Sequence, residues 1–124
     1  MVRPLDGITV VSLEQAVAAP FASRQLSDLG ARVIKIERDA GDFARAYDTK
    51  VHGEASYFVW INRNKESVVL DLKSEQGIAA LRGLVSQADV FIQNLAPGAV
   101  ERLGLSSAQA LELNPQLIYV SISG

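Results

Sequence analysis

The sequence contains no cysteine and only one histidine, His52, among its 124 residues. Without thiols, the chain can form no disulfide, no thiolate metal site and no cysteine nucleophile. One imidazole cannot build a multi-histidine metal site, and we expect no metal. Lys and Arg number 12 and Asp and Glu number 14, for a net charge of −2. That balance gives no general attraction to nucleic acid or to an anionic membrane, so any anion binding must come from locally placed cations.

Long apolar runs are absent as well. The opening stretch "MVRPLDGITVVSL" has only a short apolar run, broken by Gly7 and Thr9, which is typical of a first core strand rather than a signal peptide. No run approaches the length of a membrane span. These features predict a cytoplasmic protein. The apolar fraction of 48% and the length predict one globular domain with a real core.

Strand-like and helix-like segments alternate along the chain. Strands are predicted at residues 8–13, 32–37, 67–72, 90–93 and 117–123. Helices are predicted between them: one closed by Gly30, a short one over residues 56–64, one capped by Ser74, and one opened by a Ser106–Gln109 capping box. This alternation predicts an α/β fold, a Rossmann-like parallel sheet with flanking helices.

Three local features carry further expectations. The first helix is expected to bury the apolar residues that recur at helical spacing, namely Ala18, Ala22, Leu26 and Leu29. Residues 39–55 form a polar loop of unusual length, and residues 41–48 are hypothesised to be an ordered loop over the ligand edge. The last strand runs to the end of the chain with nothing to cover it, so we expect residues 1–124 to be the amino-terminal portion of a larger fold.

Ligands in open parallel sheets bind beyond the carboxyl ends of the strands. Arg38 follows the second predicted strand, Lys73 the third, and Asn94 the fourth, with Arg102 about one helical turn beyond the Pro97-Gly98 turn. Arginine can grip a phosphate with two parallel donors, and lysine acts as a point charge. Gathered at one edge, these residues predict a site for an anionic ligand.

Each of these residues also has an ordinary interpretation. Arg38 could pair with the adjacent Asp39, Arg102 could pair with Glu101, and Asn94 could simply form the turn. The stretch after the first strand, "EQAVAAP", lacks the glycines of a nicotinamide site, and no phosphate-binding loop of the Walker type is present. Several carboxylates are available, but their spacing singles out no pair: Glu14, Asp39, Asp42, Asp48 and Asp71.

The ordered set of motifs resembles the family III CoA-transferases, a group that includes formyl-CoA and carnitine CoA-transferases. The matching stretches are "PLDGITVVSLEQAVAAPFASRQLSDLGARVIKIER", then "GD" (Gly41-Asp42), "NRNKESVVLDLKSEQG", "ADVFIQNLAPGAVERLGL" and "NPQLIYVSISG", in that order along nearly the whole chain. The resemblance implies coenzyme A as co-substrate, acyl-CoA and carboxylic acid substrates, and an interlocked homodimer for the full-length protein. It also implies that residues 1–124 are the CoA-binding portion of the large domain.

The resemblance further implies roles for particular residues. The CoA-binding positions correspond here to Val17, Ala18, Arg38, Leu70, Asp71, Leu72, Lys73, Asn94, Leu95, Ala96 and Arg102. Formyl-CoA transferases carry a glutamine near the position of Val17 that polarises the reacting carbonyl. In this chain Gln15 is the nearby amide, displaced by two positions. Leu95 and Ala96 replace the usual phenylalanine and basic residue of the turn.

The nucleophile of such enzymes is an aspartate beyond the position of Gly124. It forms an acyl–aspartyl anhydride and then an enzyme–CoA thioester. No aspartate of this chain matches it, so the chain alone is expected to be inactive. Three alternatives stay open at this stage. One is an acyl-CoA racemase of the same superfamily, another is a non-catalytic CoA- or nucleotide-binding module, and the third is a structural fragment that binds no ligand.

Overall fold

The computed structural model describes residues 2–123, which form a five-stranded parallel sheet with helices on both faces. The strand order is β3-β2-β1-β4-β5. The strands are β1 (Thr9–Leu13), β2 (Arg32–Glu37), β3 (Lys65–Val69), β4 (Val90–Gln93) and β5 (Ile118–Ser121). Every neighbouring pair is parallel, which confirms the predicted α/β class.

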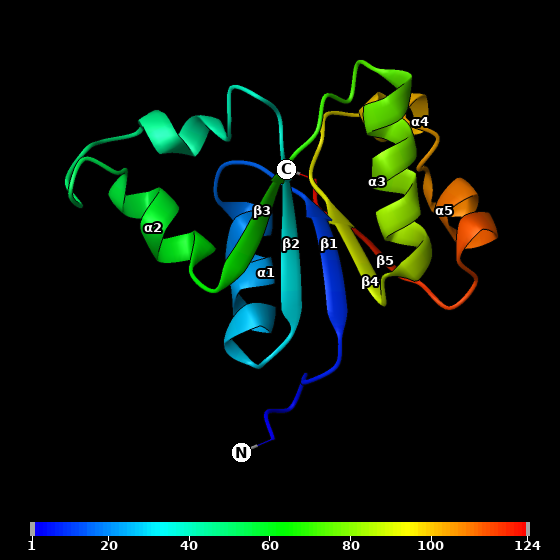
Figure 1. The fold of residues 1–124 in the computed structure, drawn as a ribbon, viewed down its shortest axis with the longest axis horizontal. Helices are drawn as coiled ribbons and strands as arrows, with labels where there is room; N and C mark the ends of the chain where they lie inside the picture. The colour runs from blue at the N-terminus through cyan, green and yellow to red at the C-terminus, as the bar shows by residue number, and fades with distance from the viewer. Residues whose placement is uncertain (1, 124) are drawn as a thin grey trace.

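The helices connect successive strands in the manner of repeated βαβ units. They are α1 (Ala18–Asp28), α2 (Ser56–Asn62), α3 (Glu75–Gln87), α4 (Ala99–Arg102) and α5 (Ser107–Leu113), with one 3₁₀ turn, η1 (Phe43–Ala46). In Figure 1, α3, α4 and α5 lie on the β4–β5 side of the molecule, and α2 lies outside β3. The predicted caps are present: Ser74 accepts the Gly77 amide, and Ser106 with Gln109 forms the capping box.

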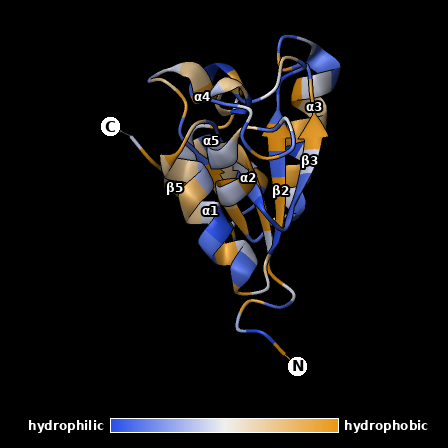
Figure 2. Cartoon of the chain, turned by 90° about the vertical axis from the view of Figure 1, so that its left-hand side faces the viewer, coloured by the Kyte–Doolittle hydropathy of each residue, from blue (hydrophilic) through white to orange (hydrophobic). Residues whose placement is uncertain are grey.

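Alternation along the strands divides the core into two layers. Val11, Ile34 and Phe91 point to the face covered by α3 and α5, whereas Val10, Val33 and Ile92 point to the face covered by α1. The hydrophobic colouring accordingly follows the strands (Figure 2). Successive side chains of a strand point to opposite faces of the sheet. The face to which a residue points therefore decides which residues it can meet at the ends of the strands.

Two local predictions require correction. The third strand was expected at residues 67–72, but β3 begins at Lys65 and ends at Val69. Its ladder with β2 ends at the Glu37–Val69 pair, because Glu37 is the last residue of β2. Leu70 adds one more hydrogen bond, from its amide to the Glu37 carbonyl at 3.0 Å, before the chain turns away. Residues 70–73 therefore form a connection beyond the strand, not part of it.

The buried side of α1 also differs from the prediction. Ala18 and Leu29 are exposed, whereas Ala22 is half-buried and Leu26 packs against the core. The small residues that the helix buries fully are Ala19, Ser23 and Ser27. This helix packs against both the sheet and α2, and small side chains allow the close approach that a two-sided contact requires. Its hydroxyl groups are satisfied there, since Ser23 donates to the Glu14 carboxylate and Ser27 to the Arg24 carbonyl.

Candidate functional site

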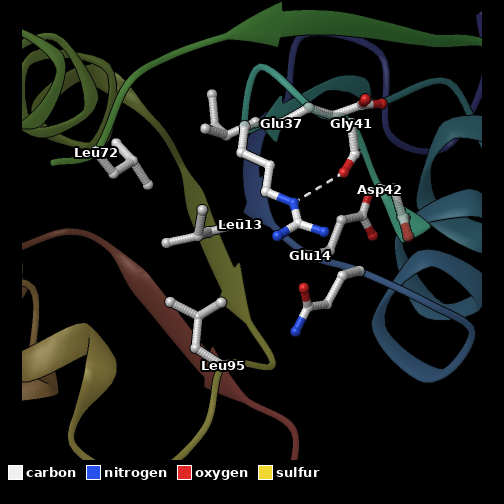
Figure 3. A pocket seen from close by; sticks show the side chains of 10 residues that line it. Leu13, Glu14, Glu37, Gly41, Asp42, Leu72 and Leu95 are labelled. Carbon is white, nitrogen blue, oxygen red and sulfur yellow. Dashed lines mark hydrogen bonds between the residues drawn. The ribbon is translucent and has the colours of Figure 1, made fainter. Parts of the chain in front are cut away.

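Two hollows open at the carboxyl edge of the sheet, and Arg38 lines both. The first, here called the Arg38 hollow, has a volume of about 180 Å³. It is lined by Leu13, Glu14, Gln15, Ile36, Glu37, Arg38, Gly41, Asp42, Leu72 and Leu95. Figure 3 shows its leucines on one side and its carboxylates with Gly41 on the other. The second, here called the Lys73 hollow, has a volume of about 490 Å³ and is lined by Arg38, Asp39, Val69, Leu70, Asp71, Leu72 and Lys73.

The strand order places the Arg38 hollow at a switch point. From β1 the chain proceeds outward to β2 and β3, and it then returns to add β4 and β5 on the other side of β1. The connections that leave β1 and β4 therefore diverge, and a crevice forms between them. Gln15 follows β1 and Leu95 follows β4, and both line the hollow.

Arg38 follows β2 directly and is exposed. Its Nε donates a hydrogen bond to the Gly41 carbonyl at 3.1 Å, drawn as a dashed line in Figure 3. The guanidinium is thus fixed by a backbone oxygen of the loop that follows. A cation held by a neutral partner keeps its full charge for an anionic ligand.

The amides that end β4 connect loops. The Asn94 side chain accepts from the Gln15 amide at 3.0 Å and donates to the Gln15 carbonyl at 2.9 Å. Gln93 donates to Ser121 and accepts from the Leu95 amide. A side-chain amide can both donate a hydrogen bond to a backbone carbonyl and accept one from a backbone N–H. The two bonds of Asn94 join the β1–α1 connection to the β4–α4 connection, which explains why the strand ends on amides.

The structure brings most of the predicted contact residues together. Around the two hollows lie Gln15, Arg38, Leu70, Asp71, Leu72, Lys73 and Leu95. Leu95 also lines a third hollow of about 190 Å³, together with Ala96. Four predicted residues lie outside the linings of these hollows. Val17 and Ala18 are exposed at the start of α1, Arg102 is exposed at the end of α4, and the half-buried Asn94 has its side chain paired with Gln15.

Beneath the Arg38 hollow lies a group of buried charges that sequence reasoning missed. Lys35 donates to the Asp42 carboxylate at 2.9 Å and lies 3.8 Å from the Glu14 carboxylate. Lys65 donates to the same Glu14 carboxylate at 2.9 Å. Each of these four side chains is at most 2% exposed. Charged side chains can be buried away from water only when they are paired with opposite charges. The two cations and two anions of this group meet that requirement by neutralising one another.

A sequence signal for this group was available. Residues 32–37 are predicted to be the second strand of a sheet with flanking helices, and Lys35 and Glu37 alternate with apolar residues in it. In the sheet both point to the same face as Glu14, as the register of β1 with β2 requires. Glu37 is held by Arg45 through two hydrogen bonds, at 3.0 and 2.9 Å. Charged residues at alternate positions of a two-sided strand predict buried ion pairs.

The pKa values follow from these contacts. Burial lowers the pKa of Lys65 to about 8, against the attraction of Glu14, which raises it. For Asp42, burial alone raises the pKa, but hydrogen bonds from the Ala16 and Ala44 amides and from Lys35 together hold it below its ordinary value. Asp42 is therefore a carboxylate at neutral pH, accepting three hydrogen bonds.

Of the remaining titratable candidates, Asp39 and Asp71 line the Lys73 hollow, whereas His52 lies away from both hollows. His52 is exposed in the turn between Val51 and Glu54. Within residues 2–123, no three His, Asp or Glu side chains gather closely enough to hold a metal ion. In the same part of the chain, no helix has the length and apolarity that crossing a membrane would require.

Comparison with known proteins gives a consistent family match. The model of CoA-transferase family III matches residues 5–124. The acetyl-CoA:oxalate CoA-transferase of Acetobacter aceti is 43% identical over 98% of this chain and 31% of its own length. The human succinyl-CoA:glutarate CoA-transferase is 38% identical over 99% of this chain and 28% of its own length.

A solved structure agrees with these matches. A CAIB/BAIF family protein from Brucella suis superposes with a TM-score of 0.92 at 40% identity, over 100% of this chain and 34% of that one. The chain thus spans about a third of the length of the relatives that it matches.

Proposed function

The chain belongs to CoA-transferase family III, and we propose that it forms the CoA-binding portion of an enzyme that moves CoA between an acyl-CoA and a carboxylic acid. The names of two relatives support this proposal, since one pairs acetyl-CoA with oxalate and the other pairs succinyl-CoA with glutarate. Because the chain spans about a third of such proteins, we assign it the binding of CoA and assign the covalent chemistry to segments outside it.

The observation that carries the proposal is the position of Arg38 between the two hollows. Arg38 and Lys73 line the same hollow of about 490 Å³, which falls within the usual range of ligand pockets, about 300–1,000 Å³. These cations can bind the phosphates of CoA through charge-assisted hydrogen bonds. Leu72 lines both hollows and offers apolar surface to the rest of the cofactor.

In the whole enzyme, an aspartate outside this chain would carry the covalent steps. Its carboxylate attacks the thioester carbonyl, forming an acyl–aspartyl anhydride and releasing the CoA thiolate. The thiolate then attacks the aspartyl carbonyl, which releases the donor acid and leaves an enzyme–CoA thioester. Covalent catalysis of this kind divides one difficult transfer into easier steps. Residues of this chain would hold the CoA moiety while its thiol end leaves and returns.

Calorimetric titration of the chain with CoA and with 3′-dephospho-CoA tests the proposal. We expect Arg38→Ala to weaken CoA binding by about ten- to a hundred-fold, the effect of losing hydrogen bonds between charged groups. Arg32→Ala is the matched control: it removes the same side chain from the other end of β2, where Arg32 pairs with Glu66. Binding of neither ligand by the unmodified chain, or equal effects of the two substitutions, would overturn the proposal.

A further inference from the structure

The carboxylate of Asp42 joins three separate segments at the Arg38 hollow. Its Oδ1 accepts from the Ala16 amide in the β1–α1 connection and from the Ala44 amide in η1, each at 3.0 Å. Its Oδ2 accepts from Lys35 in β2 at 2.9 Å. The side chain is fully buried. A single residue of the long polar loop thus connects that loop to the sheet and to the connection that begins α1.

Ala16 is held in an unfavourable backbone conformation. Its φ is +64°, a left-handed value that residues with a β-carbon rarely adopt. Gln15, the preceding residue, is held by a different side chain, because Asn94 pairs with both its amide and its carbonyl. The β1–α1 connection is therefore clamped between Asn94 and Asp42. Strain of this kind persists only where surrounding contacts determine the conformation.

The residue before Asp42 determines the position of Arg38. The Gly41 carbonyl accepts the hydrogen bond from the Arg38 Nε. Gly41 has a φ of +79°, and a β-carbon there would come within 3.0 Å of the Arg45 side chain. Glycine is needed at this point, and its carbonyl orientation is coupled to the anchoring of Asp42 one residue later.

We propose that Asp42 is a positioning residue of the CoA site, which holds the Ala16 turn and the Gly41–Arg38 contact in the geometry that receives the ligand. The inference rests on the proposed function, because it assigns a purpose to groups that would face CoA. Because the Asp42 side chain is fully buried, we assign it an indirect role in binding. It acts through the Ala16 amide and through the loop that carries Gly41.

Asp42→Asn tests this role, with Asp48→Asn as the matched control. The first change keeps the shape of the side chain but removes the charge that Lys35 requires. The second makes the same change in the same loop, where Asp48 bonds to Ser56 instead. We expect Asp42→Asn to raise the hydrogen-exchange rate of the Ala16 amide and to weaken CoA binding, each by about tenfold, the typical effect of one hydrogen bond to a charged group. Asp48→Asn should change neither quantity.

A second substitution separates positioning from general stability. Ala16→Gly permits the left-handed turn without strain, so in the Asp42→Asn background it should restore several-fold of the lost CoA affinity. If Asp42→Asn fails to fold, Ala16→Val takes its place as the test. This substitution strains the same turn but keeps the ion pair between Asp42 and Lys35, and we expect it to weaken CoA binding.

The outcomes distinguish this inference from the proposed function. Unchanged CoA affinity in Asp42→Asn would overturn the positioning role. If Asp42→Asn does not fold, unchanged CoA affinity in Ala16→Val would overturn it. If the unmodified chain binds no CoA, the proposed function fails, and the exchange rate of the Ala16 amide still decides whether Asp42 holds the turn. An unchanged rate in Asp42→Asn would refute the role under either result.

Discussion

Replacing Lys35 with methionine removes the central cation of the buried charge group. Methionine retains the apolar stem, so the main loss is the ammonium group between Asp42 and Glu14. Glu14 keeps its contact with Lys65, but Asp42 loses its only ion-pair partner among the described residues and retains only backbone amides. The substitution thus leaves a carboxylate buried without a cation.

The magnitude follows from that burial. Removing one partner of a buried ion pair costs about 3–5 kcal/mol, because the remaining charge has lost its hydration without compensation. A domain of this size has a total stability of about 5–15 kcal/mol, so the loss would be a large fraction of it. By contrast, an exposed ion pair contributes about 0.2–1 kcal/mol.

Urea unfolding followed by the fluorescence of Trp60 measures the effect. Arg32→Met is the control, since Arg32 lies on the same strand in an ion pair with Glu66 in which both side chains are more than half exposed. We expect Lys35→Met to lower the free energy of unfolding by about 3–5 kcal/mol and Arg32→Met by less than about 1 kcal/mol. Similar losses in the two variants would refute the reasoning.

Two other features lead to testable expectations. Asn94→Ala removes both hydrogen bonds to the Gln15 peptide, and we expect faster hydrogen exchange of the Gln15 amide together with a loss of about 1–3 kcal/mol in stability; unchanged exchange would contradict this. Hydrogen bonds from Ser56 and from the Lys50 amide lower the pKa of Asp48 to about 2. The stabilising contribution of Asp48 is therefore complete above its unfolded pKa, near 4, and is lost as the pH falls toward 2. The loss of stability between pH 5 and 2, followed by Trp60 fluorescence, should be smaller in Asp48→Asn, in which only the other carboxylates with lowered pKa values, such as Asp42, still titrate.

The architecture was largely predictable because its signals are local. Alternating apolar strands and capped helices require only neighbouring residues, and parallel βαβ units admit essentially one handedness. The errors arose where tertiary contacts outweighed local pattern. On α1, Leu26 packs against the core as its spacing predicts, but Ser23 is buried in addition because it donates a hydrogen bond to Glu14.

The sequence predicted which residues lie near the carboxyl edge of the sheet, while their role in binding CoA stays a prediction. The rule that ligands bind at carboxyl strand ends predicted that Arg38 and Lys73 would lie close together, and the two residues line one hollow. The same rule suggested that Asn94 would face the ligand, whereas its side chain is occupied by the Gln15 peptide. Which polar groups face a ligand and which brace a loop depends on distances between segments about 80 residues apart.

The sequence by itself determined the succession of strands and helices along the chain, the family, and the edge of the sheet where cations gather. Each of these depends on local pattern or on inherited motifs. Only the tertiary structure decided that Lys35, Lys65, Glu14 and Asp42 share one buried site, because strand register brings together side chains that no spacing in the chain relates. Long-range pairing is a property of the folded sheet, and charge can be buried only where that pairing supplies its partner.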